Sequence, residues 1–409
     1  MPDVLDRFLG YVKIHTTSKE GVDRIPSTNR QFDLARLLVE ELKEIGLKDA
    51  QVDEHCYVTA TLPSNIDTAV PVICFLAHMD TSPEEIGENV KPQVIKDYDG
   101  SDIVLSGNPE MIISVDENPA LKQFIGSDIV TSDGTTLLGG DDKAGIAEIM
   151  TTMATLVKNP EIKHGAIKVC FTPDEEVGHG VDALDVESLG ADVGYTLDGD
   201  EMGSIENETF CAATCFINIQ GMNYHPGYAK NKMVNAIRVA AAIITRLSKD
   251  MAPEATEGRQ GYLHPYTLSE GSVNKVSIKI LLRDFEWEGI EAQKKFVESI
   301  IEEVQNEYPK AIIQMKIEES YRNMKYKIPG YVVEYAEEAI RRAGLTLIRK
   351  AIRGGTDGAR LSYMGLPTPN LFSGAMNFHS KKEYVPVIAL EKAVEIVLNL
   401  IQIYVEKSK

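Results

Sequence analysis

The chain has 409 residues, more than one hydrophobic core usually supports, so its length predicts two domains. Hydrophobic residues make up 43% and charged residues 25% of the sequence, which is typical of a soluble globular protein. The formal charge of −20 argues against a nucleic-acid partner, because contacts to phosphates need a basic surface.

The sequence shows neither a targeting segment nor a membrane span. The N-terminal residues start no apolar run, and the apolar stretch near the C-terminus is interrupted by Asn399 and Gln402. The five cysteines form an odd set, and three of them lie in strand-like runs, so we expect reduced, buried thiols. These features predict a cytoplasmic protein without a membrane partner.

The predicted elements of the first half alternate between helices and buried strands. Apolar residues recur at helical spacing over 29–45, a continuous apolar run covers 69–77, and a helix is predicted over 142–157. Two more buried strands, at 166–171 and 191–197, each lead to acidic residues. This order is typical of an α/β domain whose site lies at the carboxyl ends of its strands.

The pattern changes near residue 210. A compact α+β order is predicted there, with a strand at 214–220, a helix at 232–247, a strand at 273–285, a helix at 289–308 and a strand at 312–318. The first pattern then returns with a helix at 331–343, a glycine-rich turn at 353–358, a strand at 368–372 and a helix at 388–405. We therefore predict that residues 209–321 are inserted into one domain formed by residues 1–208 and 322–409.

The first chemical motif, His78-Met79-Asp80, ends a buried strand. Side chains alternate along a strand, so His78 and Asp80 can face the same side while Met79 points away. Histidines that bind metal often have a carboxylate that fixes their tautomer, and Asp80 could serve His78 in this way. A structural histidine at a capped strand end is the alternative interpretation.

Two further motifs carry adjacent acids. Asp141 and Asp142 follow two glycines, which let the backbone approach a ligand. The two adjacent carboxylates repel each other, and this repulsion would be offset if one of them bridged two metal ions. Glu175 and Glu176 follow a buried strand, so one could bind metal while the other acts as a general base. The alternatives are an acidic helix start and a solvated acidic loop.

Asp198 and His379 complete the set. Asp198 ends a strand as the other acids do, whereas Asp200 is interpreted as a loop acid, and His379 supplies a second histidine. Several carboxylates that converge without lysine or arginine repel one another unless cations lie between them. These residues together predict a two-metal hydrolase site.

Together, and in this order, the motifs resemble the M20 family of metallo-aminopeptidases and carboxypeptidases, and within it the tripeptide aminopeptidases. The likeness extends from Ser27 to the C-terminal helix, and five segments carry it: His78 to Pro83, Leu138 to Gly145, Pro173 to Gly178, Ile352 to Gly358 and Asn377 to His379. It implies an α/β catalytic domain with a mixed, mainly parallel sheet flanked by helices, and an inserted α+β lid domain.

The resemblance also implies a role for each motif residue. Two zinc ions would share Asp141, one with His78 and Asp198 and the other with Glu176 and His379. The family pattern assigns Asp80 to orienting His78 and Glu175 to general base catalysis. A cis peptide between Asp141 and Asp142 is expected as well.

Substrate contacts are implied for His225, Arg283 and Arg353. His225 could stabilise an oxyanion, and an arginine could hold the terminal carboxylate of a peptide. The chain departs from the family pattern at Tyr228, where threonine is usual, and at Ser380, where glycine is usual. Both departures leave the implied metal ligands unchanged and concern the substrate pocket.

The activity implied by the resemblance is the zinc-dependent release of the N-terminal residue of tripeptides, so small peptides are the expected partners. Another M20-type amidohydrolase, such as a dipeptidase, a carboxypeptidase or an N-acyl amino acid deacylase, would use the same ligands. A non-catalytic, metal-stabilised binding protein is a further alternative. Exposed strand edges in the lid also suggest a homodimer that forms through this domain.

Overall fold

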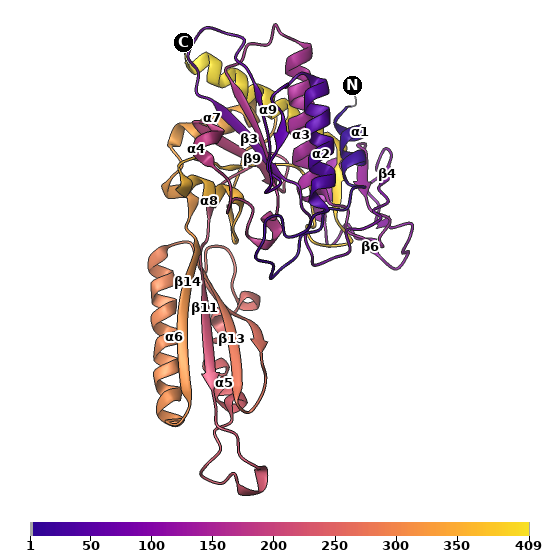
Figure 1. Cartoon of the computed structure of the whole chain (residues 1–409). Coiled ribbons are helices and arrows are strands. Elements are labelled where there is room, and N and C mark those ends of the chain that lie inside the picture. Colours follow the sequence, from indigo (N-terminus) through magenta and orange to yellow (C-terminus); the bar gives the residue numbers. More distant parts are fainter. Residues whose placement is uncertain (1–2, 409) are drawn as a thin grey trace. The chain divides into compact units, whose positions relative to one another are not determined.

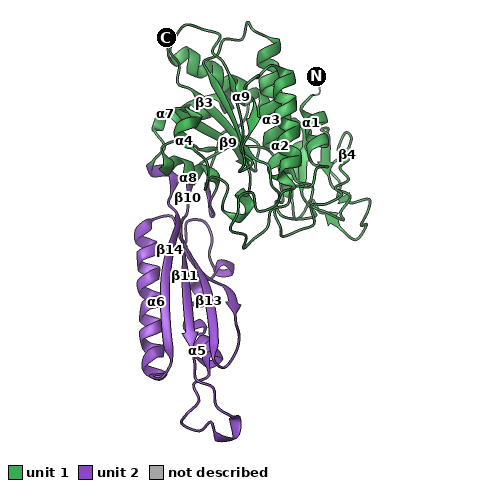
Figure 2. Ribbon diagram, viewed as in Figure 1, with its two compact units in different colours: residues 1–207, 327–350, 356–409 green, residues 208–326, 351–355 purple. Residues whose placement is uncertain are grey.

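The computed structural model describes residues 3–408, which divide into two compact units (Figure 2). Unit 1 comprises the residues up to 207, residues 327–350 and the residues from 356 onward. Unit 2 comprises residues 208–326 and 351–355. The insertion predicted from the sequence, residues 209–321, has limits close to those of unit 2. Residues 351–355 were not predicted to belong to it.

Unit 1 is built on a mixed sheet (Figure 1). Its strands lie in the order β1 (Gln51–Val52), β2 (Val58–Leu62), β8 (Ile167–Thr172), β3 (Ile73–His78), β9 (Val193–Gly199), β16 (Asn370–Phe372), β10 (Ser204–Thr209) and β15 (Ile348–Ile352). The central neighbours β8, β3, β9 and β16 run parallel, whereas β1, β2 and β10 are antiparallel to their partners.

Helices cover both faces of this sheet. The helices of unit 1 are α1 (Val4–Tyr11), α2 (Gln31–Ile45), α3 (Gly140–Lys158), α4 (Val186–Leu189), α7 (Gly330–Arg342), α8 (Asp357–Met364) and α9 (Val387–Lys407). Side chains alternate along β3, so Phe75 packs in a core with α1, α2, α3, α7 and α9, and Leu76 packs in a second cluster with Leu189 and Leu361. The predicted α/β fold class, a mixed sheet flanked by helices, is confirmed.

The segment between β3 and α3 contributes strands to two smaller sheets, one of which also includes β17 from the C-terminal part of the chain. One contains β17 (Tyr384–Pro386), β7 (Ile129–Thr131) and β4 (Gln93–Ile95), and the other pairs β5 (Ile103–Val104) with β6 (Ile112–Ile113). Their apolar side chains pack in a separate cluster that includes Tyr98, Phe124 and Tyr384. We predicted no element here, because strands of two or three residues are too short to show a periodic pattern.

Unit 2 has the predicted α+β character. Its antiparallel sheet has the order β12 (Tyr262–Ser269), β13 (Lys275–Asp284), β11 (Cys211–Gln220) and β14 (Ile312–Tyr321), and it packs with helices α5 (Ala236–Ile244) and α6 (Trp287–Glu307). The edge strand β12 was not predicted. It contains Pro265, where the register shifts, and it is largely exposed, so it lacks the apolar alternation of a buried strand.

All five cysteines are buried and free, as predicted. Within residues 3–408, no helix combines the length and the apolar character that crossing a membrane requires.

Candidate metal centre

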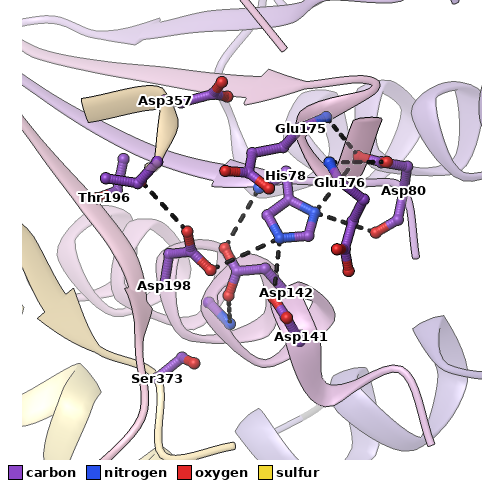
Figure 3. Close-up of polar contacts among 12 residues, drawn as sticks. His78, Asp80, Asp141, Asp142, Glu175, Glu176, Thr196, Asp198, Asp357 and Ser373 are labelled. Carbon is purple, nitrogen blue, oxygen red and sulfur yellow. Dashed lines mark hydrogen bonds and ion pairs between the residues drawn. The ribbon is translucent and has the colours of Figure 1, made fainter. Parts of the chain in front are cut away.

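The candidate centre lies in unit 1, where the carboxyl ends of three parallel strands meet. His78 ends β3 and pairs in register with Thr172 at the end of β8, while Asp198 lies near the end of β9. Beyond β8, a short 3-10 helix at Glu175–Val177 carries the two glutamates. The predicted convergence of these motifs at one edge of the sheet is therefore observed (Figure 3).

Asp141 reaches this edge from the N-terminal end of α3. The backbone there is not helical at Asp141 and Asp142, and the peptide bond between them is cis, as the family resemblance implies. The preceding Gly139 has a φ of 82°, which glycine adopts without steric cost. This irregular turn places the Asp141 side chain between the two histidines.

Two groups of potential metal ligands share Asp141. In the first, His78 Nε2 lies 2.9 Å from Asp141 Oδ1 and 3.6 Å from Asp198 Oδ1. In the second, His379 Nε2 lies 2.7 Å from Glu176 Oε2 and 3.4 Å from Asp141 Oδ2. Within each group, all ligand atoms lie within 4.8 Å of one another. The two oxygens of one carboxylate thus face two different histidines.

The electrostatics of the two groups fit divalent cations. Burial raises the pKa of Glu176 to about 8 and that of Asp198 to about 6, and the charge of Asp141 acts in the same direction on both, so these carboxyls resist carrying a negative charge beside Asp141. Glu176 Oε1 is also buried, and it has no hydrogen-bond partner among residues 3–408. Metal ions would compensate the clustered negative charges, and Glu176 Oε1 could coordinate one of them. The nitrogen and oxygen donors of the two groups are ligand types that zinc accepts.

Neighbouring carboxylates raise the pKa of both histidines, and Asp141 acts on both rings. Burial alone would lower the pKa of His78, but hydrogen bonds from its ring to Asp141 and Asp198 raise it well above its ordinary value. Burial also opposes protonation of His379, whose interactions with Asp141 and Glu176 raise its pKa to about 11. The two rings differ in access to solvent, because the His78 side chain is 2% exposed and that of His379 is 36% exposed.

Asp80 lies behind His78, as predicted. Its Oδ1 is 3.4 Å from His78 Nδ1, and its backbone carbonyl is 3.0 Å from the same nitrogen. The Asp80 carboxylate also accepts the backbone N–H groups of Glu175 at 3.0 Å and Glu176 at 3.3 Å. Asp80 is fully buried and can therefore fix both the imidazole and the turn that carries the glutamates.

Glu175 belongs to neither ligand group. Burial raises the pKa of its carboxyl well above the ordinary value, and the negative charges of Asp198 and Asp357 act in the same direction. Figure 3 shows the side chain beside the ring of His78. A carboxyl with a raised pKa that is not needed as a ligand is suited to accept and return a proton.

Three acids near the centre were not predicted. Glu383 accepts the backbone N–H groups of Leu138, Gly139 and Asp141 at 2.9, 2.7 and 2.9 Å, and burial raises its pKa to about 7. Glu84 Oε2 lies 3.1 Å from His379 Nδ1. Asp357 accepts the hydroxyl hydrogen of Thr172 at 2.7 Å. Glu383 precedes β17 and Glu84 lies six residues beyond the end of β3, so neither directly follows a buried strand and the pattern of acids after strands could not find them.

The three residues expected to contact substrate lie in unit 2. His225 is exposed and its Nδ1 accepts the backbone N–H of Gly227. The guanidinium of Arg283 donates to the carbonyls of Ala213 and Leu282, and that of Arg353 donates to the backbone between residues 256 and 260. Their roles toward substrate remain predictions.

Comparisons with known proteins show the family of this chain. Residues 139–403 match the model of peptidase family M20/M25/M40. The chain is 49% identical to peptidase T of Clostridium botulinum over the full length of both proteins. The structures of aminopeptidase PepT from Bacillus cereus and of a tripeptidase from Staphylococcus aureus are each 26% identical, cover 98% of both chains and give TM-scores of 0.75 and 0.77. On this evidence, the chain belongs to peptidase family M20/M25/M40.

Proposed function

We propose that this chain is a zinc-dependent aminopeptidase that releases the N-terminal residue of tripeptides. The observation that carries the proposal is Asp141, whose two oxygens lie in two groups of histidine and carboxylate ligands. The substrate class is supported by the likeness to peptidase T and to a tripeptidase.

The ligand assignment follows the two groups. We assign His78, Asp141 and Asp198 to one zinc ion and Asp141, Glu176 and His379 to the other. When bound, such a pair of ions lowers the pKa of a water molecule and polarises the carbonyl of the scissile peptide bond. Imidazole and carboxylate ligands suit zinc, but cobalt and manganese accept them too, so the metal itself must be measured.

Glu175 is proposed as the general base. It would accept the proton of the attacking water and return it to the leaving amine, a transfer that its raised pKa favours. Asp80 would hold His78 in the tautomer that leaves Nε2 free for metal. The clustered carboxylates would also attract the positively charged α-amine of a peptide.

For the substrate we retain the three predicted residues of unit 2. His225 would donate to the oxyanion, and Arg283 or Arg353 would hold the terminal carboxylate. We further propose a cytoplasmic homodimer that forms through unit 2, whose edge strands β12 and β14 expose Leu268 and Ile312. Light scattering should then give about twice the chain mass of 45.1 kDa, and a particle of one chain mass would contradict the dimer.

The substrate assignment can be tested with a peptide panel. Zinc-loaded protein should release the first residue of unblocked tripeptides faster than it cleaves dipeptides or tetrapeptides, as judged by mass spectrometry of the products. The N-acetylated form of each tripeptide is the matched control and should not be cleaved. Preferential cleavage of dipeptides or of N-acyl amino acids would assign the chain to another amidohydrolase activity.

A further inference from the structure

Asp174 is the one acid of the Asp174-Glu175-Glu176 run that the proposed chemistry leaves without a role. It is fully buried, although it lies immediately before the two glutamates. Its backbone has a φ of 51°, in the left-handed region that is uncommon for residues other than glycine, although aspartate enters it more readily than most. Neighbouring contacts must therefore hold Asp174 in place.

These contacts come from an N-terminal segment that is distant in sequence. Ser27 donates its backbone N–H to Asp174 Oδ2 at 2.5 Å and its hydroxyl to Asp174 Oδ1 at 2.5 Å. The Gln31 side chain donates to the same Oδ1 at 2.6 Å and accepts the backbone N–H of Asp174 at 3.2 Å. Short bonds to a carboxylate are the strong class of protein hydrogen bonds, and burial of all three residues shields them from water.

The same segment is tied to the end of β3. The backbone N–H of Ser18 donates to the carbonyl of Thr81 at 3.1 Å, and Thr17 forms a parallel bridge with Thr81. Within the segment, Ser27 Oγ accepts the backbone N–H of Lys19 at 2.9 Å. We call residues 17–31 the strap, because they link the strand end that carries His78 to the turn that carries the glutamates.

The strap and Asp80 hold the glutamate turn from different directions. Asp80 accepts the backbone N–H groups of Glu175 and Glu176, and Asp174 fixes the residue that precedes them. Loss of the Asp174 contacts would leave the strand end intact but free the turn to shift. Displacements of about 1 Å at a reacting group can lower the rate about 100-fold.

We infer that Asp174 is a positioning residue, which acts through Ser27 and Gln31 to fix the carboxylates of Glu175 and Glu176 at the metal centre. Asp174 touches neither substrate nor metal in this role. The inference rests on the proposed function for its kinetic consequence, whereas its consequence for metal binding through Glu176 can be measured without any turnover.

The test exchanges the two members of the buried pair. Asp174→Asn places an amide NH2 group among the N–H and hydroxyl of Ser27 and the amide of Gln31, which all donate, so either orientation of the new amide loses at least one hydrogen bond. Gln31→Glu places two carboxylates together, so it also breaks the contact. In the double variant, the new amide at position 174 can donate to the new carboxylate at position 31 and restore the contact. Asp133→Asn is the matched control, since Asp133 is also buried and accepts the N–H and hydroxyl of a neighbouring residue, Thr135.

We expect each single variant to lower kcat about 10- to 100-fold, the usual range for residues that orient ligands, with KM changed less than about threefold. Zinc competition with a chromophoric chelator should show weaker binding of one zinc equivalent by a similar factor. The double variant should recover most of both losses, and Asp133→Asn should resemble the wild type in both measurements.

Two results would overturn the inference. One is a folded single variant, as judged by its thermal unfolding midpoint, whose kcat and zinc affinity stay within about twofold of the wild type. The other is a double variant whose kcat and zinc affinity are no higher than those of the less active single variant. Should a single variant not fold, Ser27→Ala, which removes the hydroxyl that donates to Asp174 and accepts the N–H of Lys19, should still lower kcat several-fold. If the wild type cleaves no tripeptide, the proposed function fails, and zinc competition alone decides the positioning role.

Discussion

The Asp80 carboxylate accepts the backbone N–H of Glu175 at 3.0 Å, and the oxygen that accepts it lies 3.4 Å from His78 Nδ1. One buried side chain therefore contacts both the ring of a proposed zinc ligand and the backbone of the proposed base. We therefore expect the arrangement to couple metal binding to the position of the proposed base, because both groups contact Asp80.

We expect Asp80→Asn to lower kcat/KM and zinc affinity together, each by about 10- to 100-fold. An amide nitrogen would face N–H donors, so one of the bonds to His78, Glu175 or Glu176 must be lost. Tripeptide hydrolysis and chelator competition measure the two effects. The exposed Asp67→Asn is the control, and an Asp80→Asn protein with unchanged zinc affinity would contradict the role assigned to Asp80.

Glu175→Gln should separate catalysis from metal binding. The amide cannot accept the proton, so we expect kcat to fall by about 100- to 10,000-fold while the protein still binds two zinc ions. Glu176→Gln is the matched variant one residue away, and it should lose the zinc ion that Glu176 is proposed to bind with Asp141 and His379. Undiminished turnover by Glu175→Gln would exclude Glu175 as the base.

Glu84 provides a contrast with Asp80. It lies 3.1 Å from His379 Nδ1, but its side chain is 68% exposed. Water can replace an exposed partner, so Glu84→Gln should weaken zinc binding by less than about threefold. Chelator competition on Glu84→Gln and Asp80→Asn, measured side by side, checks this order. A larger loss in Glu84→Gln would show that solvent does not screen this contact.

The pH dependence of stability should report Glu148 in α3. This carboxyl is fully buried, neither oxygen has a hydrogen-bond partner within residues 3–408, and burial raises its pKa well above the ordinary value. The folded state therefore keeps the proton after the unfolded chain has lost it. The contribution of the Glu148 carboxyl to the free energy of unfolding is complete below about pH 4.3, which is the pKa of the unfolded chain. This contribution is lost as the pH rises toward the folded pKa, at up to about 1.4 kcal/mol per pH unit.

Glu148→Gln should remove this pH-dependent loss, since glutamine does not ionise. Denaturant unfolding between pH 5 and 8 should show the variant gaining stability relative to the wild type as the pH rises. The surface variant Glu161→Gln should track the wild type. A constant difference between Glu148→Gln and the wild type across this range would mean that Glu148 already carries a charge when folded.

The sequence predicted the parts of the centre that follow buried strands. His78 and Asp198 end strands of the central sheet, and Glu176 follows a third strand, so a continuous apolar run pointed to each of them. Glu383 could not be predicted in this way. It reaches the Gly139 turn from a distance of more than 240 residues in sequence, and only the folded chain reveals its three backbone contacts.

The fold also has parts that a local sequence pattern predicts and parts that it does not. The long buried helix α3 was predicted at 142–157, close to its observed limits of Gly140–Lys158, because burial imposes a periodic apolar pattern. The continuous apolar run at 69–77 also pointed to β3, but this strand begins at Ile73, four residues later than predicted. The edge strand β12 and the short strands β4 to β7 are held by pairing with neighbouring strands rather than by a pattern of their own. Tertiary pairing of this kind leaves little trace in the local sequence.

The central claim is that Asp141 is shared by two zinc ions, and zinc titration of the metal-free protein tests it most directly. The wild type should bind two equivalents of zinc per chain, His379→Ala should keep one tight equivalent, and Asp141→Ala should lose tight binding at both positions. If Asp141→Ala still binds two zinc ions as tightly as the wild type, the shared carboxylate and the two-metal centre built on it are wrong.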